Sequence, residues 1–359
     1  MVRQYDFKDS LQKVHRENIR NYDIKPNSDD FVLSEEIVIT VPKNVGEVVK
    51  TAAGDFIDYL FTSMNISAII GIEGIIEISV AAENPSKETA FDITFDEKIY
   101  ISAADERSVA QALYYLEDLM SERKAPYIKK EKISIQMPFT LRMVPSTYKG
   151  ILPPDEYLSL IAHQGLNTVM YGAKGLDNIS ATQFVALVKK LSKWGLDIYC
   201  CSSIPSKYHP DDPEAKDYYA KTYGEFIKRF PEVQGIILVG ECIGFPSKDP
   251  NCSGVHRLKP ADGIPIGKTD PGFYPCNDYY KFVNIVKDSV RPYNKDIDIV
   301  FWTYNFWSHP LEARMECINN LPTDISLMVT FELSEQYKMD GITKFCCDYT
   351  ISRIGPCEV

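Results

Sequence analysis

From Phe139 onward the chain alternates apolar, strand-like runs with amphipathic helical stretches, and this rhythm limits the possible folds more than any other feature. Such alternation is typical of βαβ units, in which helices connect the strands of a parallel sheet. The predicted strands are Thr140–Ser146, Thr168–Tyr171, Asp197–Ser202, Gly235–Val239, Ile297–Thr303, Ile325–Thr330 and Lys344–Asp348. They predict an α/β fold of the (β/α)8 barrel type, of which about seven strands are visible. A closed barrel usually occupies about 250 residues, so an eighth unit would not fit in this part of the chain.

An open barrel of this kind would leave its first and seventh strands as unpaired edges, which natural sheets avoid. We therefore expect the barrel to be incomplete at the C-terminus of this chain. A missing segment of a longer protein, or a second copy in a homo-oligomer, would complete it. A doubly wound open sheet is the alternative fold, but the Gly-x-Gly-x-x-Gly phosphate turn usual in that fold is absent.

Residues 36–138 have a different pattern and predict a small α/β accessory domain, after an N-terminal extension over residues 1–35 and before the barrel domain over 139–359. We expect a mixed or antiparallel sheet there and no catalytic constellation. The predicted elements are strand Ile37–Val41, helix Gly46–Met64, strand Gly74–Ala82, a hairpin of Ala90–Phe95 with Lys98–Ser102, a helix capped by Asp105, and strand Lys132–Gln136.

Composition excludes several classes of partner. The net charge of −11 argues against nucleic acid and anionic membrane surfaces. No apolar signal core begins the chain and no uncharged apolar stretch of about 18 residues is present, which favours a cytoplasmic location. The nine cysteines do not form repeated Cys-x-x-Cys spacings, so we predict reduced thiols, no metal site and no cofactor. The adjacent pairs Cys200-Cys201 and Cys346-Cys347 are interpreted as small core residues.

Glu241 is the best candidate for a catalytic acid. It follows the apolar run Gly235–Val239, with Gly240 between them. A run that is apolar on both faces predicts a buried parallel strand, and barrels keep their active sites at the carboxyl ends of such strands. The alternative is that Glu241 forms an ion pair or marks the end of the strand.

Further polar and aromatic side chains follow the other predicted strands and would share that edge. Cleavage of a glycosidic bond needs one carboxylic acid to protonate the leaving oxygen and a second carboxylate as base or nucleophile, and aromatic rings stack on sugar faces. The second carboxylate is Glu332 or Asp348, each of which has a local capping or ion-pair role as its alternative. The predicted sugar contacts are Tyr148, Tyr171, Trp302, Tyr304, Asn305 and Trp307.

The remaining polar positions have simpler interpretations. Because long loops are usually functional, we expect Cys242–Asn277 to cover the sugar site. Asp278 is predicted to cap the helix that follows this loop. The histidines at the helix end and in loops, His163, His209 and His309, are predicted to be capping or surface residues.

Several segments resemble known glycoside hydrolases. Ile99–Asp105 and the helix after it resemble the end of the accessory domain that precedes the barrel in β-N-acetylhexosaminidases and α-glucuronidases, and Pro138–Arg142 resembles the junction with that barrel. Phe230–Glu241 resembles the α-glucuronidase strand whose terminal glutamate is the general acid. The resemblance implies that Glu241 is the acid and that a carboxylate follows the seventh strand, which favours Asp348 as base.

One departure affects the mechanism. Hexosaminidases that use the acetamido group of the substrate carry an aspartate directly before the acid, whereas this chain has Gly240. Cleavage assisted by an N-acetyl group is therefore disfavoured. The predicted function is hydrolysis of O-glycosidic bonds in a carbohydrate. A non-catalytic carbohydrate-binding or scaffold protein is the alternative, and an isomerase or lyase for phosphorylated sugars lacks a convincing phosphate loop, since only Gly355-Pro356 is available.

Overall fold

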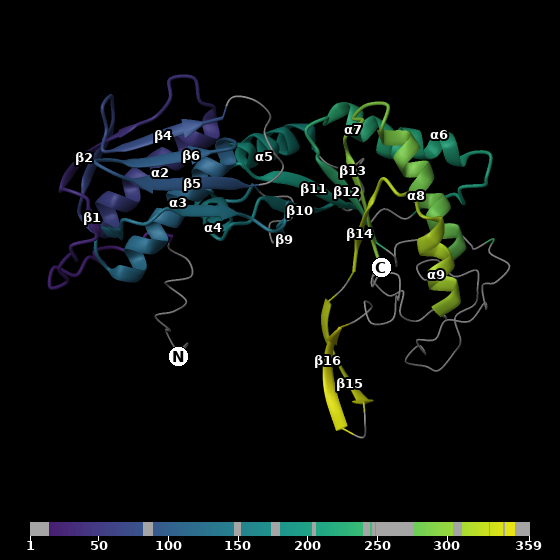
Figure 1. Ribbon diagram of the computed structural model, residues 1–359. Coiled ribbons are helices and arrows are strands. Elements are labelled where there is room, and N and C mark those ends of the chain that lie inside the picture. Colours follow the sequence, from purple (N-terminus) through teal and green to yellow (C-terminus); the bar gives the residue numbers. More distant parts are fainter. Residues whose placement is uncertain are drawn as a thin grey trace, which may run out of the picture. The chain divides into compact units, whose positions relative to one another are not determined.

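The structure is a computed structural model that describes residues 14–81, 89–146, 152–173, 180–202, 206–239, 245, 248, 276–303, 311–329, 331–339 and 342–348 (Figure 1). Side chains are described for all of these except residues 173, 202, 276, 277, 311–314, 331–339 and 342–348. The chain divides into two compact units. The first comprises Met1–Val144, Gly150–Val169 and Ala186–Asp197, and the second comprises Pro145–Lys149, Met170–Val185 and Ile198–Val359.

A six-stranded mixed sheet forms the centre of the first unit, in the order β3-β2-β4-β6-β5-β8. Strands β3, β2, β4 and β6 run parallel, whereas β5 is antiparallel to both β6 and β8. A separate antiparallel pair joins β1 to β7. The strands are β1 Asp30–Val32, β2 Glu36–Thr40, β3 Ser67–Ile70, β4 Ile76–Val80, β5 Ala90–Phe95, β6 Ile99–Ala103, β7 Tyr127–Lys129 and β8 Ile133–Gln136.

Two long helices, α2 (Glu47–Met64) and α3 (Glu106–Arg123), contact one another and lie against this sheet (Figure 1). Each has an apolar stripe at helical spacing that is buried against the strands. The predicted cap is confirmed, because the side chain of Asp105 accepts a hydrogen bond from the backbone N–H of Ser108 at 2.6 Å. The helix and hairpin predictions for this region are confirmed, while β1, β3 and β7 are additional strands.

The first unit also includes residues 150–169 and 186–197, which the sequence analysis assigns to the barrel. Helix α4 (Asp155–His163) packs on α3, where the amide of Gln111 donates to the carbonyl of Ala162 at 2.9 Å. Arg107 of α3 donates to the carbonyl of Gly195 at 2.7 Å and to the carboxylate of Asp197 at 3.0 Å. These bonds from α3 explain why both segments group with the accessory domain.

A second six-stranded sheet has the order β14-β13-β12-β11-β10-β9, and β11 to β14 run parallel to one another. The strands are β9 Met143–Pro145, β10 Thr168–Ala173, β11 Asp197–Ser202, β12 Gly235–Val239, β13 Asp298–Trp302 and β14 Ser326–Met328. The helices after β10 are α5 Ala181–Lys193, α6 Ala215–Tyr219, the π-helical turn η2 Ala220–Gly224, α7 Glu225–Arg229, α8 Cys276–Val290 and α9 Leu311–Asn320. Six of the predicted parallel-sheet strands are therefore present, with ends shifted by a few residues.

The seventh predicted strand is wrong. Residues of Lys344–Asp348 belong to β16 (Ile342–Asp348), which pairs antiparallel with β15 (Phe331–Met339) in a sheet of its own. The two strands are separated only by Asp340-Gly341, a dipeptide favoured in two-residue hairpin turns, whereas a parallel pair needs a crossover of a dozen residues or more. Glu332 consequently lies within β15 rather than after a parallel strand.

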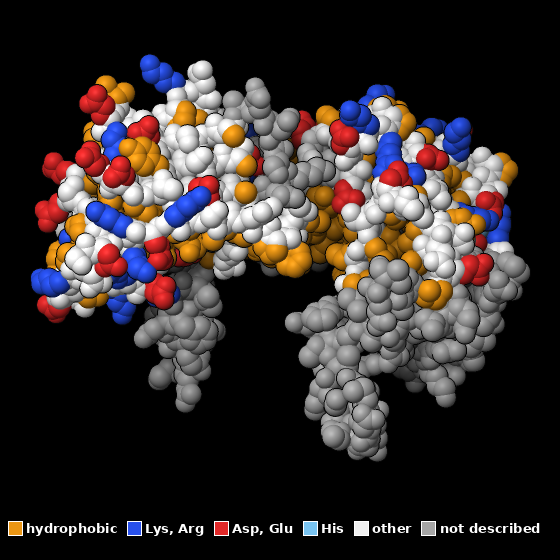
Figure 2. All heavy atoms as spheres, viewed as in Figure 1, with side chains coloured by type: hydrophobic (Ala, Val, Ile, Leu, Met, Phe, Trp, Pro, Cys, Tyr) orange, Lys and Arg blue, Asp and Glu red, His pale blue; other side chains and the backbone are white. Residues whose placement is uncertain are grey.

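Charges are mixed on the face shown in Figure 2, where Lys and Arg side chains lie among Asp and Glu on the described surface. No large area of a single sign is visible on that face. Among the residues described, none of the helices has both the length and the apolarity that a membrane span requires.

Candidate active site and a histidine–carboxylate cluster

Strand β12, which precedes the predicted catalytic acid, is held firmly in the sheet. All five of its residues are buried, and it is paired in parallel on both sides, with β11 and β13. Its last carbonyl, that of Val239, accepts a hydrogen bond from the hydroxyl of Tyr279 in α8. The strand therefore ends at a fixed point, and Glu241 follows two residues later in the chain.

Five of the predicted site residues lie outside the described residues: Glu241, Tyr148, Tyr304, Asn305 and Trp307. Glu332 and Asp348 are described by their backbones alone. Asp348 pairs with Phe331, the residue before Glu332, so the backbone register brings both carboxylate-bearing residues to the same end of the β15–β16 hairpin. Their catalytic roles stay predictions.

Trp302 is the last residue of β13 and is in register with Val239 of β12. Its neighbours Phe301 and Thr303 are fully buried, and the ring of Phe301 lies 4.6 Å from that of Tyr279 in α8. Because side chains alternate along a strand, Trp302 points to the opposite face of the sheet and stays partly exposed. Contact of Trp302 with sugar stays a prediction.

Tyr171 of β10 is less clearly placed for binding. Its ring is partly exposed and lies edge-on against the buried ring of Phe184 in α5, with 6.1 Å between the ring centres. At least part of this side chain therefore packs against the helix. Its contact with sugar stays a prediction.

The surface prediction for His209 is wrong. Its side chain is buried, its Nε2 lies 2.8 Å from Asp278 Oδ1, and its Nδ1 accepts from the backbone N–H of Asp211 at 3.0 Å. The neutral Nε2–H tautomer satisfies both contacts, with Nε2–H donating to the carboxylate. The pair joins the segment after β11 to the first turn of α8 and uses each ring nitrogen once, which indicates a structural role.

Asp278 is not the helix cap that the sequence predicts. Helix α8 begins at Cys276, so Asp278 lies inside its first turn. Its second oxygen accepts from the backbone N–H of Lys248 at 3.0 Å. The carboxylate therefore joins two neighbouring segments to α8.

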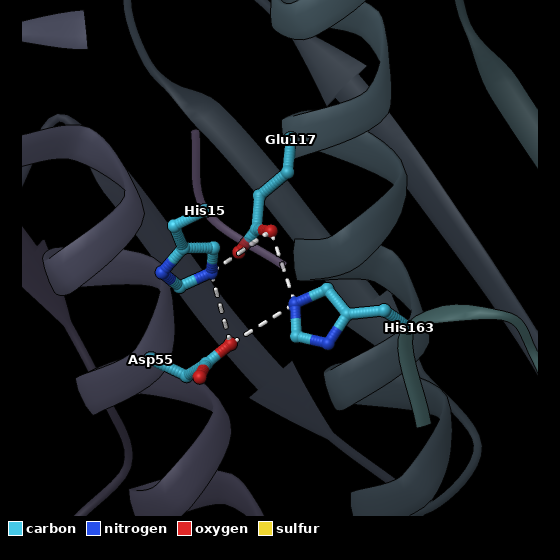
Figure 3. A group of neighbouring side chains, drawn as sticks. All are labelled: His15, Asp55, Glu117 and His163. Carbon is cyan, nitrogen blue, oxygen red and sulfur yellow. Dashed lines mark hydrogen bonds and ion pairs between the residues drawn. The ribbon is translucent and has the colours of Figure 1, made fainter. Parts of the chain in front are cut away.

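A second constellation lies in the first unit, where three helices and the segment before β1 bring two histidines and two carboxylates together (Figure 3). His15 precedes β1, Asp55 comes from α2, Glu117 from α3, and His163 is the last residue of α4. His163 Nε2 lies 3.0 Å from Asp55 Oδ2 and 3.1 Å from Glu117 Oε2. His15 Nε2 lies 3.4 and 3.6 Å from the same two oxygens.

The other ring nitrogens of both histidines are already used. His15 Nδ1 lies 2.8 Å from Asp58 Oδ2, and His163 Nδ1 lies 2.8 Å from the backbone carbonyl of Ser159. A carboxylate and a carbonyl only accept hydrogen bonds, so each Nδ1 carries the proton and each Nε2 is directed at the centre of the cluster.

Without a bound cation the cluster is a network of charges. Burial opposes protonation, but the adjacent carboxylates of Asp55 and Glu117 outweigh it and raise the pKa of His15 to about 10 and that of His163 to about 9. Burial also opposes ionisation of Asp55, yet the two histidines lower its pKa to about 2. In this form two imidazolium groups face two carboxylates.

The sequence does not predict this cluster. His163 is predicted to be a capping or surface residue, whereas its side chain is mostly buried, and neither a constellation in residues 36–138 nor a metal site is expected. The absence of Cys-x-x-Cys spacing argues only against metal sites made of cysteine thiolates and not against sites made of histidines and carboxylates. One usable observation was present: Glu117 lies in the apolar stripe of α3, next to Leu113, Leu116 and Met120, and is itself buried.

Neither a protein-family model nor a curated protein matches this sequence. Solved structures do. The N-acetyl-β-hexosaminidase of Streptomyces plicatus matches with a TM-score of 0.58 at 11% identity, over 91% of this chain and 76% of the enzyme. A family GH115 4-O-methyl-α-glucuronidase with specificity for decorated arabinogalactans matches with 0.54 at 12% identity, over 83% of this chain and 45% of the enzyme.

A GH138 enzyme that targets pectin rhamnogalacturonan II also matches, with a TM-score of 0.55 at 13% identity, over 85% of this chain and 50% of that enzyme. The chain thus spans about half the length of the GH115 and GH138 enzymes. At these identities the likeness concerns the fold. The chain has the α/β fold, with a parallel-stranded sheet, of glycoside hydrolases of the α-glucuronidase and β-N-acetylhexosaminidase type.

Proposed function

We propose that this chain is part of a glycoside hydrolase that cleaves O-glycosidic bonds with a pair of carboxyl groups. The observation that carries the proposal is the geometry of β12, which is buried throughout, is anchored at Val239 by Tyr279, and leads within two residues to Glu241. Barrel enzymes place their catalytic groups directly after such buried parallel strands, which supports Glu241 as the proton donor. The fold shared with glycoside hydrolases supports the same conclusion.

In the proposed reaction Glu241 protonates the leaving oxygen, and Asp348 acts as base, with Glu332 as the alternative partner. Asp348 is in register with Phe331, the residue before Glu332, and this supports treating Asp348 and Glu332 as alternatives for one role. A separation of about 5 Å between the paired carboxyl groups gives retention of configuration, and about 6.5–9.5 Å gives inversion. Gly240 favours a mechanism without participation of a substrate acetamido group.

The sugar is proposed to stack on Trp302, with Tyr171 and the aromatic residues outside the described range completing the site. A further segment or a second copy of the chain would close the barrel. A cytoplasmic location is part of the proposal as well. The barrel proposal rests on the parallel run of β11 to β14, since the β15–β16 hairpin supplies no seventh parallel strand.

The test is a hydrolysis screen with aryl glycosides, glucuronides and N-acetylhexosaminides. Glu241→Gln is compared with the wild type and with Glu232→Gln, an exposed glutamate just before β12. We expect Glu241→Gln to lower kcat by about 10²–10⁴-fold and Glu232→Gln to leave it unchanged. Turnover that survives Glu241→Gln would refute the assignment. Sugar binding without any turnover would instead support the carbohydrate-binding alternative.

A further inference from the structure

We propose that His15, Asp55, Glu117 and His163 bind one four-coordinate metal ion, and that this ion is zinc. The site lies in the first unit, and it is independent of the proposed glycosidase reaction (Figure 3).

Four of the six distances among the donor atoms are close to the edges of a tetrahedral zinc site. The four contacts between imidazole Nε2 atoms and carboxylate oxygens measure 3.0, 3.1, 3.4 and 3.6 Å, and all four donor atoms lie within 4.8 Å of one another. Zinc bonds of about 2.0–2.2 Å to nitrogen and oxygen correspond to edges of about 3.3–3.6 Å in a tetrahedron. The remaining two distances, between the two Nε2 atoms and between the two carboxylate oxygens, are at most 4.8 Å, so binding of a tetrahedral ion would draw the wider pair together by up to about 1.2–1.5 Å.

The histidines are oriented as metal ligands. Asp58 holds Nδ1–H of His15, and the carbonyl of Ser159 holds Nδ1–H of His163, at 2.8 Å in each case. Metal-ligating histidines typically donate their second ring N–H to a carboxylate or a carbonyl, which fixes the ring and directs the other lone pair to the metal. Both Nε2 atoms here have that orientation.

Hydrogen bonds alone leave the cluster incompletely satisfied. His163 Nε2 faces two carboxylate oxygens at almost equal distance. Because one N–H group forms only one strong hydrogen bond, the second oxygen is left without one. Among the described residues, His15 Nε2, Asp55 Oδ2 and Glu117 Oε1 are buried without a hydrogen-bond partner of good geometry. The side chain of Glu117 is only 5% exposed, so its charge is costly to leave unmet. A central cation would bond to all four groups at once.

A pocket of about 350 Å³ gives the ion a route to the cluster. Its lining includes His15 and Asp55 of the cluster itself, together with the carboxylates of Asp58, Asp155 and Glu156. Asp155 is also paired with Lys190 and Lys193, so its charge is partly balanced. The carboxylates at the pocket attract cations toward the cluster.

The donor set selects the metal. Two imidazoles and two carboxylates in a tetrahedral arrangement suit zinc, whereas magnesium and calcium prefer six or more oxygen ligands. Four protein ligands would fill the coordination shell, which is typical of structural zinc sites. The ion would join the segment of His15 to α2, α3 and α4.

The experiment uses the whole chain, stripped of metal with a chelator and titrated with zinc by calorimetry. Cobalt(II) is the spectroscopic substitute, because its visible spectrum reports tetrahedral coordination. We expect one zinc per chain with a dissociation constant below about 1 μM. Thermal unfolding followed with and without zinc should show a rise in Tm with the metal, since binding stabilises the folded state.

Two ligand variants and one control test the assignment. His15 lies outside the helices and strands, so His15→Ala should fold, and His163→Gln removes the ligand at the end of α4. Each variant should bind zinc at least 100-fold more weakly and lose the tetrahedral cobalt spectrum. Asp118→Asn, exposed and adjacent to Glu117, is the matched control and should bind as the wild type does. Circular dichroism checks that each variant is folded.

Three outcomes would overturn the proposal. The first is a zinc dissociation constant above about 1 μM for the folded wild type, which would mean that the cluster is an ion-pair network. The second is binding that both ligand variants retain. The third is a cobalt spectrum of octahedral type. The glycosidase screen is read separately, so its failure leaves this result unaffected.

Discussion

Replacing Gly235 by alanine should destabilise the second unit by a collision with one identified ring. Gly235 begins β12 opposite Tyr199 of β11. A Cβ at this position would overlap Cε1 and Cδ1 of Tyr199 and would lie 2.8 Å from its Cζ. The ring is buried, and its hydroxyl donates to Asp298 Oδ2 at 3.2 Å, so it has little freedom to swing away.

The size of the effect follows from these contacts. Overpacking of a dense core costs about 1–3 kcal/mol. Movement of the ring away from Asp298 would cost about 1 kcal/mol more through the lost hydrogen bond. Alanine itself recovers about 0.5–1 kcal/mol of the entropy cost that glycine has in a strand. We therefore expect Gly235→Ala to lower the free energy of unfolding by about 1–3.5 kcal/mol.

Urea unfolding followed by tryptophan fluorescence and circular dichroism measures this loss. Gly54→Ala is the matched control, because Gly54 is exposed on α2 and a Cβ there would meet no atom within 4 Å. That control should stabilise the protein by about 0.5–1 kcal/mol.

Making the same substitution in a Tyr199→Ala protein separates the collision with the ring from other effects of the added methyl group. In a Tyr199→Ala protein the ring is gone, so adding Gly235→Ala should cost less than about 0.5 kcal/mol, and the coupling energy between the two changes should be about 2 kcal/mol. An equal cost in both backgrounds would refute the argument. So would a wild-type-like stability of Gly235→Ala alone.

Two further predictions concern the first unit. The guanidinium of Arg123 donates to both oxygens of the buried Asp30 carboxylate and keeps its pKa below the usual value, so Asp30→Asn should cost about 1–3 kcal/mol near pH 7. The difference in unfolding free energy between the wild type and Asp30→Asn should shrink as the pH falls below about 4 toward the lowered pKa, because the carboxyl group of the unfolded chain binds its proton first. A difference that stays constant from about pH 7 to 2 would contradict this prediction. Asp105→Ala should cost about 1 kcal/mol by removing the cap of α3, and Asp105→Ser should restore most of it in the same urea assay; equal losses in both would exclude a capping role.

Elements with strong local patterns were predictable from sequence, and short non-local ones were not. Helix α2, the β5–β6 hairpin and the Asp105 cap follow from periodicity and capping chemistry within each segment. The pair of β1 with β7 joins three-residue strands that are almost 100 positions apart, so neither strand has a recognisable pattern by itself. The β15–β16 hairpin is different, because Asp340-Gly341 indicates its turn in the sequence.

The same contrast applies to the sites. Strand β12 could be predicted because a single apolar run identifies it, and the run leads directly to Glu241. The cluster could not be predicted in this way, because His15 and His163 are separated by most of the first unit's chain and meet only after folding. His15 also lies in the segment that the sequence analysis treats as an extension.

Two of the four cluster residues nevertheless imply their partners. Asp55 and Glu117 lie beside apolar, buried positions of α2 and α3, and these two helices pack against one another. Two carboxylates held so close in a partly dry interior repel each other unless cations meet them. The cationic groups that the structure places against them are two histidines, which are also the commonest metal ligands. A buried acidic residue in an apolar helix stripe therefore implies a cationic partner elsewhere in the fold, and here the partners are two histidines with which it forms the proposed metal site.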